Sequence, residues 1–229
     1  MKILIVSGFL GAGKTTFIKR LARNVDQRFA ILENEYGAAG IDGARLGQNR
    51  QGTQKNVWEM TEQCICCIGK KDFAASVLTI ANVVDPEYLI VEPTGVGSLA
   101  RIIENLRQIE YERIQLLSPV TIVDVYSYRR YMAEYPELYQ DQIRSADTII
   151  VSKTEACQAE EKQRIQKFLQ EINSQAKIIT DYASTMTRED YQSLLLGGRY
   201  EKEVQDTQSG EKMPETFSFE NIRMEAPET

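Results

Sequence analysis

Short apolar runs alternate with amphipathic stretches along most of the chain. The amphipathic stretches have apolar residues at helical spacing, as Phe17, Leu21 and Val25 show in the first of them. The apolar runs are typical of strands buried on both faces, and they span 2–6, 29–35, 87–92, 118–125, 147–153 and 176–180, with a shorter candidate at 56–60. The predicted helices span 14–25, 71–84, 98–109, 158–172 and 187–196, with further polar helical segments up to 145. Strands separated by helices pair in parallel, so we expect an α/β fold with a mostly parallel central sheet and helices on both faces.

The pattern divides the chain into a domain over 1–196 and a tail over 197–229. The tail is polar and poor in apolar residues, as linkers are, apart from an alternating stretch at 216–224 that could form one strand. We interpret that strand as part of a missing or vestigial C-terminal domain. Within the first domain, residues 36–56 are rich in glycine and predict a long loop, a kind that is usually functional or disordered.

Composition excludes several classes of protein. The net charge of −6 and the pI of about 5.0 argue against a general binder of nucleic acid or of anionic membranes. No apolar run is long enough to span a bilayer, so we expect a soluble cytoplasmic protein with reduced thiols. Histidine is absent from the 229 residues, which excludes a histidine general base and an imidazole metal ligand. Any metal must therefore be held by thiolate or oxygen.

The segment GFLGAGKTT, residues 8–16, matches the P-loop pattern G-x-x-x-x-G-K-[ST] between a predicted strand and a predicted helix. Its glycines let successive backbone N–H groups point at the β-phosphate of a nucleotide. Lys14 would supply a cation to the β- and γ-phosphates during catalysis, Thr15 would bind Mg²⁺, and Thr16 would contact the α-phosphate. The predicted nucleotide-binding residues of this loop are Gly8, Gly11, Ala12, Gly13, Lys14, Thr15 and Thr16. The fold class thus narrows to a P-loop nucleoside triphosphatase.

A carboxylate ends the apolar strand in YLIVEPTG, residues 88–95. Buried strands of open α/β sheets present functional residues at their carboxyl ends. Glu92 could therefore reach Mg²⁺ through a water or orient the water that attacks the γ-phosphate. Gly95 would bring its backbone N–H to that phosphate. The alternative is a strand-terminal glutamate that faces solvent.

The segment SKTE, residues 152–155, ends another apolar strand and resembles the guanine-recognition element of GTPases. In that element the lysine stem stacks on the base and a carboxylate accepts hydrogen bonds from the guanine edge. Ser152, Lys153 and Glu155 stand at the matching positions, with glutamate in place of the usual aspartate. Because guanine requires such a paired acceptor and adenine does not, we prefer GTP to ATP. Asp124, at a further strand end, either lines the site or caps the next helix.

Three of the four cysteines lie close together at positions 64, 66 and 67, in the segment EQCICCIGK. Cys64 and Cys66 would face one way in an extended chain and Cys67 the other, so the three sulfurs converge only if the chain turns here. Three thiolates with one oxygen ligand suit Zn²⁺, Co²⁺ or Ni²⁺. The alternative is a set of small buried residues in front of a helix.

In their order and spacing, these motifs, with ENEYG at 33–37, resemble the CobW-like GTPases, which are related to the nickel-insertion GTPases of urease and hydrogenase maturation. The resemblance implies slow GTP hydrolysis with Mg²⁺ and a transition metal at Cys64, Cys66 and Cys67, with Glu33 as a further ligand. It also implies delivery of that metal, commonly zinc or cobalt, to a client metalloprotein or cofactor, and it makes a homodimer plausible. The chain departs from the family pattern at Gln63, where glycine is usual, at Ala38, where an acidic residue is common, and in its lack of a histidine-rich tail.

Two other functions are compatible with the same motifs. The protein could be a GTPase chaperone for the assembly of a cofactor-dependent enzyme, such as a corrinoid enzyme, with structural cysteines. It could also be a P-loop small-molecule kinase, although such kinases usually carry an arginine-rich lid, for which Arg45 and Arg50 are the nearest candidates.

Overall fold

A computed structural model describes residues 1–27, 29–33, 57–61, 70–93 and 95–202. Its eight strands form one sheet in the order β3-β2-β4-β1-β6-β7-β8, with β5 also paired to β1. All the pairings between these strands are parallel, which confirms the predicted fold class. The strands are β1 (Lys2–Gly8), β2 (Phe29–Glu33), β3 (Val57–Thr61), β4 (Tyr88–Glu92), β5 (Gln115–Leu116), β6 (Val120–Asp124), β7 (Thr148–Ser152) and β8 (Lys177–Ile179).

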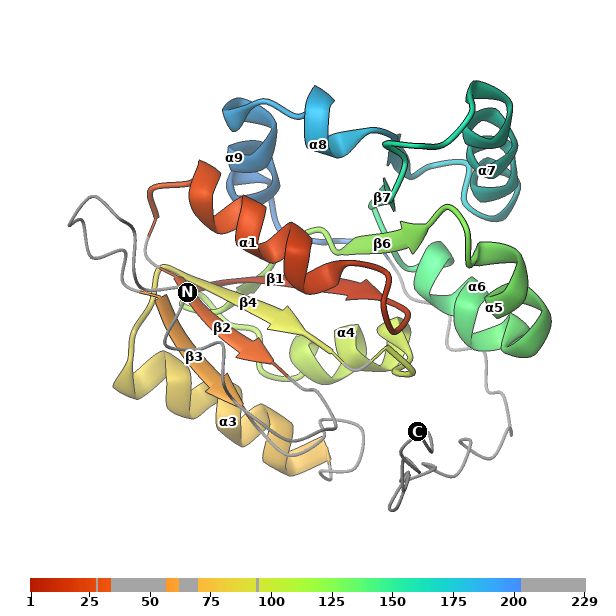
Figure 1. The fold of residues 1–229 in the computed structure, drawn as a ribbon. Helices are drawn as coiled ribbons and strands as arrows, with labels where there is room; N and C mark the ends of the chain where they lie inside the picture. Colours follow the sequence, from red (N-terminus) through yellow and green to blue (C-terminus); the bar gives the residue numbers. More distant parts are fainter. Residues whose placement is uncertain (28, 34–56, 62–69, 94, 203–229) are drawn as a thin grey trace, which may run out of the picture.

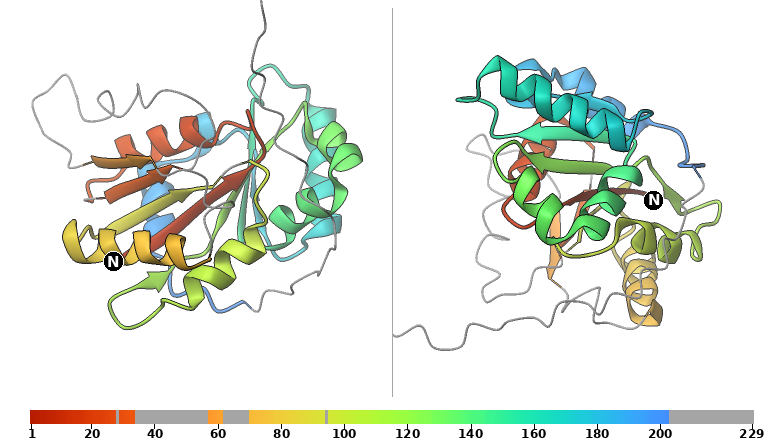
Figure 2. Two further views of the ribbon diagram at one scale, coloured as in Figure 1. Left: turned by 90° about the horizontal axis from the view of Figure 1, so that it is seen from below. Right: turned by 90° about the vertical axis from the view of Figure 1, so that its right-hand side faces the viewer.

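Helices cover both faces of the sheet (Figure 1 and Figure 2). They are α1 (Lys14–Asn24), α3 (Lys70–Val83), α4 (Leu99–Arg107), α5 (Tyr128–Glu134), α6 (Pro136–Arg144), α7 (Ala159–Ile172), α8 (Tyr182–Thr185) and α9 (Arg188–Leu196). None of the helices in the described ranges is both long and apolar enough to cross a membrane.

The apolar strand residues divide between the two faces because successive side chains of a strand point to opposite sides. Leu4 and Val6 of β1 pack in one cluster with α1, α8 and α9. Ile3 and Ile5 pack in a second cluster with α3 and α4. A third cluster joins residues of β6 and β7 to α5, α6 and α7. Burial on both faces explains why these strands have continuous apolar sequences rather than alternating ones.

Two short elements were not predicted from the apolar pattern. β5 has only two residues and forms where the chain returns to β1 after a tight turn, in which Tyr111 and Ile114 exchange backbone hydrogen bonds. α8 is a single turn that follows Asp181, a residue in the left-handed region with φ of 55°. Its Tyr182 packs edge-on against Phe17 of α1. Both elements depend on distant partners, so local sequence carries little sign of them.

The packed part of the chain continues beyond residue 196. Tyr200 is buried, its backbone N–H donates to the Leu116 carbonyl at 2.8 Å, and its hydroxyl donates to the Ser145 carbonyl at 3.1 Å. Arg199 forms an antiparallel bridge with Leu117. The segment 197–202 therefore packs against the domain rather than leaving it as a linker. The predicted strand at 216–224 lies outside the described residues.

The parallel topology brings the predicted site residues to one edge of the sheet. Strands β1, β4, β6 and β7 end at Gly8, Glu92, Asp124 and Ser152, and parallel strands have their carboxyl ends on the same side. β1 lies between β4 and β6, where the strand order reverses direction. Ligands of open α/β sheets bind at such a switch point.

Candidate nucleotide-binding site

The P-loop leaves β1 through a glycine that has no room for a side chain. Gly8 has a φ of 141°, and a Cβ placed on it would lie 2.4 Å from the Ile122 carbonyl oxygen of β6. The loop then folds back, with the Ala12 N–H donating to the Phe9 carbonyl at 3.0 Å. Gly13, in the left-handed region, precedes α1 directly. The loop thus ends at the amino terminus of an 11-residue helix, where unpaired N–H groups and the helix dipole favour an anion.

The first turn of α1 brings two predicted magnesium ligands together. The Thr15 hydroxyl donates a hydrogen bond of 2.9 Å to Glu92 Oε1 at the end of β4. A hydroxyl and a carboxylate form an oxygen donor pair of the kind that Mg²⁺ takes in nucleotide sites. Lys14 is buried, and its Nζ donates to the Phe9 carbonyl at 3.4 Å, within the loop itself. Thr16 is exposed in the same turn.

The loop after β4 lies directly against the P-loop. A Cβ on Gly95 would stand 2.3 Å from the Leu10 backbone nitrogen and 2.9 Å from the Phe9 carbonyl carbon. Real side chains essentially never approach backbone so closely, so only glycine fits here. Glu92 and Gly95 therefore border the phosphate loop, as their predicted roles require. The intervening Thr94 lies outside the described residues.

The residues of the predicted base-recognition segment, 152–155, differ in burial and in what they contact. Ser152 is buried, and its hydroxyl lies 2.6 Å from the Ala12 carbonyl, to which it donates. Ser152 therefore binds the backbone of the P-loop. Lys153 follows in the left-handed region with φ of 59°, and it is exposed, as is Glu155. The turn therefore presents Lys153 and Glu155, but not Ser152, to solvent.

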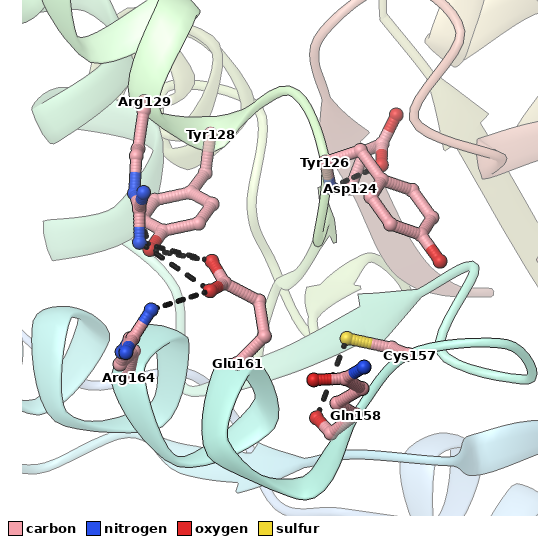
Figure 3. Close-up of polar contacts among 8 residues, drawn as sticks. All are labelled: Asp124, Tyr126, Tyr128, Arg129, Cys157, Gln158, Glu161 and Arg164. Atoms are coloured by element: carbon pink, nitrogen blue, oxygen red, sulfur yellow. Dashed lines mark hydrogen bonds and ion pairs between the residues drawn. The ribbon is translucent and has the colours of Figure 1, made fainter.

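Asp124 is the partner of Lys153. Its carboxylate, 6% exposed, accepts hydrogen bonds from Lys153 Nζ at 2.7 Å, from the Tyr126 N–H at 2.9 Å and from the Ser127 hydroxyl at 2.9 Å. Figure 3 shows Asp124 with the Tyr126 bond. Burial raises the pKa of Asp124, but these hydrogen bonds and the Lys153 charge outweigh it, and the pKa falls below its ordinary value. The ionised carboxylate holds the turn after β6 and pairs with Lys153. It does not cap the next helix, because α5 begins after Ser127 without a side-chain cap. That Asp124 lines the nucleotide site stays a prediction.

A second polar group fastens the helices beside this turn. Glu161 of α7 accepts hydrogen bonds from the Tyr128 hydroxyl at 3.2 Å and from Arg129 at 3.0 Å, and it pairs with Arg164 at 3.4 Å (Figure 3). The Tyr128 and Arg129 contacts join α5 to α7, whereas the Arg164 pair lies within α7. The helix that follows the Asp124 turn is therefore held against α7.

The predicted metal ligands are placed only in part. Cys64, Cys66 and Cys67 lie outside the described residues. The flanking residues are Thr61 at the carboxyl end of β3 and Lys70 at the start of α3. Glu33 ends β2, and its backbone is in register with Glu92 of β4. Among the described residues, no three acidic or cysteine side chains form a group that could hold a metal ion.

Gln142 and Tyr131 were missed by the sequence interpretation, although both contact the loops of the site. The Gln142 amide donates to carbonyls of the loop after β4, and the Tyr131 hydroxyl donates to the Leu10 carbonyl of the P-loop at 3.0 Å. Both residues lie in helices, at positions where a polar side chain is ordinary. No motif marks them.

Comparison with known proteins agrees with this geometry. The sequence model of the family "CobW/HypB/UreG, nucleotide-binding domain" matches residues 2–180. The zinc chaperone YeiR of Escherichia coli is 30% identical over 178 residues, which cover 76% of this chain and 53% of that protein. The chain spans about half the length of the curated relatives it matches.

Two solved structures share the fold. The crystal structure of Zn(II)-bound YjiA GTPase from Escherichia coli has a TM-score of 0.60 at 22% identity, over 82% of this chain and 59% of that one. Hydrogenase maturation factor HypB from Archaeoglobus fulgidus has a TM-score of 0.61 at 17% identity, over 86% of this chain and 89% of that one. With the family match over most of its length, the chain belongs to the CobW/HypB/UreG family of nucleotide-binding domains.

Proposed function

We propose that the protein binds and slowly hydrolyses GTP and carries a transition metal to a client metalloprotein or cofactor. The observation that carries the GTPase part is the contact between Thr15 and Glu92 beside Lys14, at the amino terminus of α1. A P-loop with these neighbours can bind the phosphates and position a hydrolytic water. The membership of the family, which includes GTPases, supports the same reaction.

Each residue around the phosphates has a distinct role in this proposal. Lys14 neutralises charge that develops on the β- and γ-phosphates, and the backbone N–H groups of the P-loop bind the β-phosphate. Thr15 and Glu92 would hold Mg²⁺, which supplies charge neutralisation to the same phosphates when bound. Glu92 also orients the attacking water, and the Gly95 N–H stabilises the γ-phosphate.

The base site follows from the pairing of Lys153 with Asp124. Because the ammonium is neutralised at 2.7 Å, the aliphatic stem of Lys153 is the part left to pack against a flat base. Glu155 is exposed two residues later and would accept the N–H donors of guanine, while Ser152 holds the P-loop below them. Guanine offers paired donors and adenine does not, so we propose GTP as the preferred nucleotide.

The metal is cargo rather than a resident cofactor in this proposal. Cys64, Cys66 and Cys67 would bind Zn²⁺, Co²⁺ or Ni²⁺ through thiolates, with Glu33 as an oxygen ligand. Two observations support this. The matched relative from Escherichia coli is named a zinc chaperone, and the backbone of Glu33 is in register with Glu92 of the nucleotide site. Metal and nucleotide would then bind next to each other, which allows each to alter the affinity of the other.

The test is an anaerobic titration of the full chain with each of the three metals, with and without Mg-GTP, combined with a phosphate-release assay on GTP and ATP. We expect thiolate-to-metal absorption with Co²⁺ and turnover of GTP in preference to ATP. Turnover of ATP alone with transfer to a small molecule would favour the kinase instead.

A further inference from the structure

Gln142 lies in α6, yet its amide holds the loop that follows Glu92. The side chain is 1% exposed, and Nε2 donates to the Gly95 carbonyl at 3.1 Å and to the Gly97 carbonyl at 2.9 Å. Both amide protons are therefore used on one short loop. Glycine has the least restricted backbone of any residue. The two hydrogen bonds therefore limit the backbone conformation of the loop at Gly95 and Gly97, where it is least restricted by side chains.

The neighbouring residue of α6 holds the next part of the same segment. Asp141 Oδ2 accepts the Leu99 N–H at 2.7 Å and the Ala100 N–H at 3.4 Å, the first N–H groups of α4. An acceptor at this position binds N–H groups that have no partner within the helix. A negatively charged side chain there also interacts favourably with the dipole of α4. Residues 95–100 are thus attached to two consecutive side chains of one helix.

Helix α6 and its neighbour are themselves fixed to the sheet and to the P-loop. The Thr121 hydroxyl of β6 donates to the Gln142 carbonyl at 2.8 Å. From α5, the Tyr131 hydroxyl donates to the Leu10 carbonyl at 3.0 Å, and Leu10 is the residue against which Gly95 packs. The loop after Glu92 is therefore held between the P-loop on one side and Gln142 on the other.

The pattern of bonds at Gln142 is better suited to positioning than to stability. Within the described residues its Oε1 is buried and has no hydrogen-bonding partner, and a buried unpaired acceptor costs free energy. An apolar side chain of the same size would avoid that cost but would take the two hydrogen bonds from the Gly95 and Gly97 carbonyls. What only the amide supplies is two donors aimed at the Gly95 and Gly97 carbonyls.

We propose that Gln142 is a positioning residue for GTP hydrolysis, which sets the backbone of Gly95 against the γ-phosphate and the end of β4 against the attacking water. This inference rests on the proposed function. Gln142 acts through the loop and does not touch nucleotide. Its loss should lower the rate of the chemical step and leave the binding of GDP, which has no γ-phosphate, unchanged.

The experiment compares Gln142→Met, which keeps the volume and removes the donors, with a matched control, Asn173→Leu. Asn173 is also buried, and its amide donates to the carbonyls of Ile143, Arg144 and Ala146 at 2.8, 3.2 and 2.8 Å, away from the loop. For Gln142→Met we expect kcat for GTP to fall about tenfold, with the Kd for GDP unchanged within about twofold. For Asn173→Leu we expect lower thermal stability with kcat unchanged.

Amide hydrogen exchange of residues 95–100 gives a second readout that does not depend on turnover. Exchange in this segment should be faster in Gln142→Met than in wild type and unaltered in Asn173→Leu. An unchanged kcat in Gln142→Met, or an equal loss in Asn173→Leu, would overturn the inference, as would unchanged exchange at 95–100. Failure of the wild-type protein to hydrolyse GTP would instead contradict the proposed function, and the exchange data would still decide whether Gln142 holds the loop.

Discussion

The Thr15 hydroxyl donates a hydrogen bond of 2.9 Å to Glu92 Oε1, which joins residues that are 77 positions apart in the sequence. The bond connects the last part of the P-loop, in the first turn of α1, with the end of β4. It brings the hydroxyl of the nucleotide motif next to the carboxylate predicted to act in hydrolysis.

Replacing Glu92 with glutamine tests that carboxylate. Glu92→Gln keeps the size and can still accept the Thr15 hydrogen bond, but it removes the charge that would hold Mg²⁺ and orient the attacking water. We expect kcat for GTP to fall at least about 100-fold, as for loss of a general-base or water-positioning group, with GDP affinity little changed. Steady-state phosphate release measures this. The matched control is Glu104→Gln, an exposed carboxylate on α4, and equal activity of the two variants would refute the assignment.

Asp124 predicts a specific dependence of stability on pH. Its pKa is lowered in the folded protein, so its stabilisation is present above the unfolded value and is lost as the pH falls through the folded value, below about pH 4. Asp124→Asn should therefore lower the free energy of unfolding at pH 7 and flatten its decline in acid. Urea unfolding at pH 7 and pH 3.5 measures both. A variant with the same acid decline as wild type would show that the contacts of the ionised Asp124 carboxylate, with Lys153, Tyr126 and Ser127, do not stabilise the fold.

Replacing Gly95 with alanine tests a purely steric contact, because the change adds a methyl group and no charge. In Gly95→Ala the new Cβ would meet the Leu10 backbone nitrogen at 2.3 Å, so one of the two loops must move. We expect a loss of about 1–3 kcal/mol in the free energy of unfolding, together with weaker GTP binding. The control is Gly198→Ala, because a Cβ there meets nothing within 4 Å. Equal free energies of unfolding and equal GTP affinities in the two variants would contradict the close approach of the Gly95 loop to the P-loop.

Ser152 tests whether the first residue of the SKTE segment supports the P-loop. Ser152→Ala removes the hydrogen bond to the buried Ala12 carbonyl and leaves that acceptor without it. We expect a loss of about 1–3 kcal/mol in stability. GTP and GDP affinities should fall by the same factor, because the P-loop binds both nucleotides. Isothermal titration with each nucleotide checks this; a selective loss of guanine preference over adenine would show instead that Ser152 reads the base.

The extent to which the sequence could predict this molecule differs between its parts. Strands such as β4 and β6 are buried on both faces, so their apolar runs are continuous and mark them locally. The ends of those strands carry polar residues, and this pattern placed Glu92 and Asp124 at the edge of the sheet where β1 ends in the P-loop. By contrast, β5 forms only because β1 offers it a partner, and Tyr200 lies in a polar stretch that gives no sign of its burial.

Contacts between segments that are distant in the sequence were harder to predict than the strand ends. Asp124 was placed at the edge from sequence, but its role depends on Lys153, which arrives 29 positions later. Gln142 has the appearance of a surface residue of an amphipathic helix, and only the three-dimensional path of the loop after β4 reveals its two acceptors. Contacts of this kind depend on how the elements pack, and no local pattern encodes them.

We propose that the GTP site and the cysteine metal site operate together, and zinc affinity measured in two nucleotide states decides whether they do. Zn²⁺ competition against a chromophoric chelator would be measured anaerobically on the full chain, with Mg²⁺ and either a non-hydrolysable GTP analogue or GDP. We expect a zinc site in wild type that is lost in the triple variant Cys64→Ser, Cys66→Ser, Cys67→Ser. We also expect wild type to bind zinc about tenfold more tightly with the GTP analogue than with GDP. Equal zinc affinity in wild type and the triple variant, or in the two nucleotide states, would contradict it.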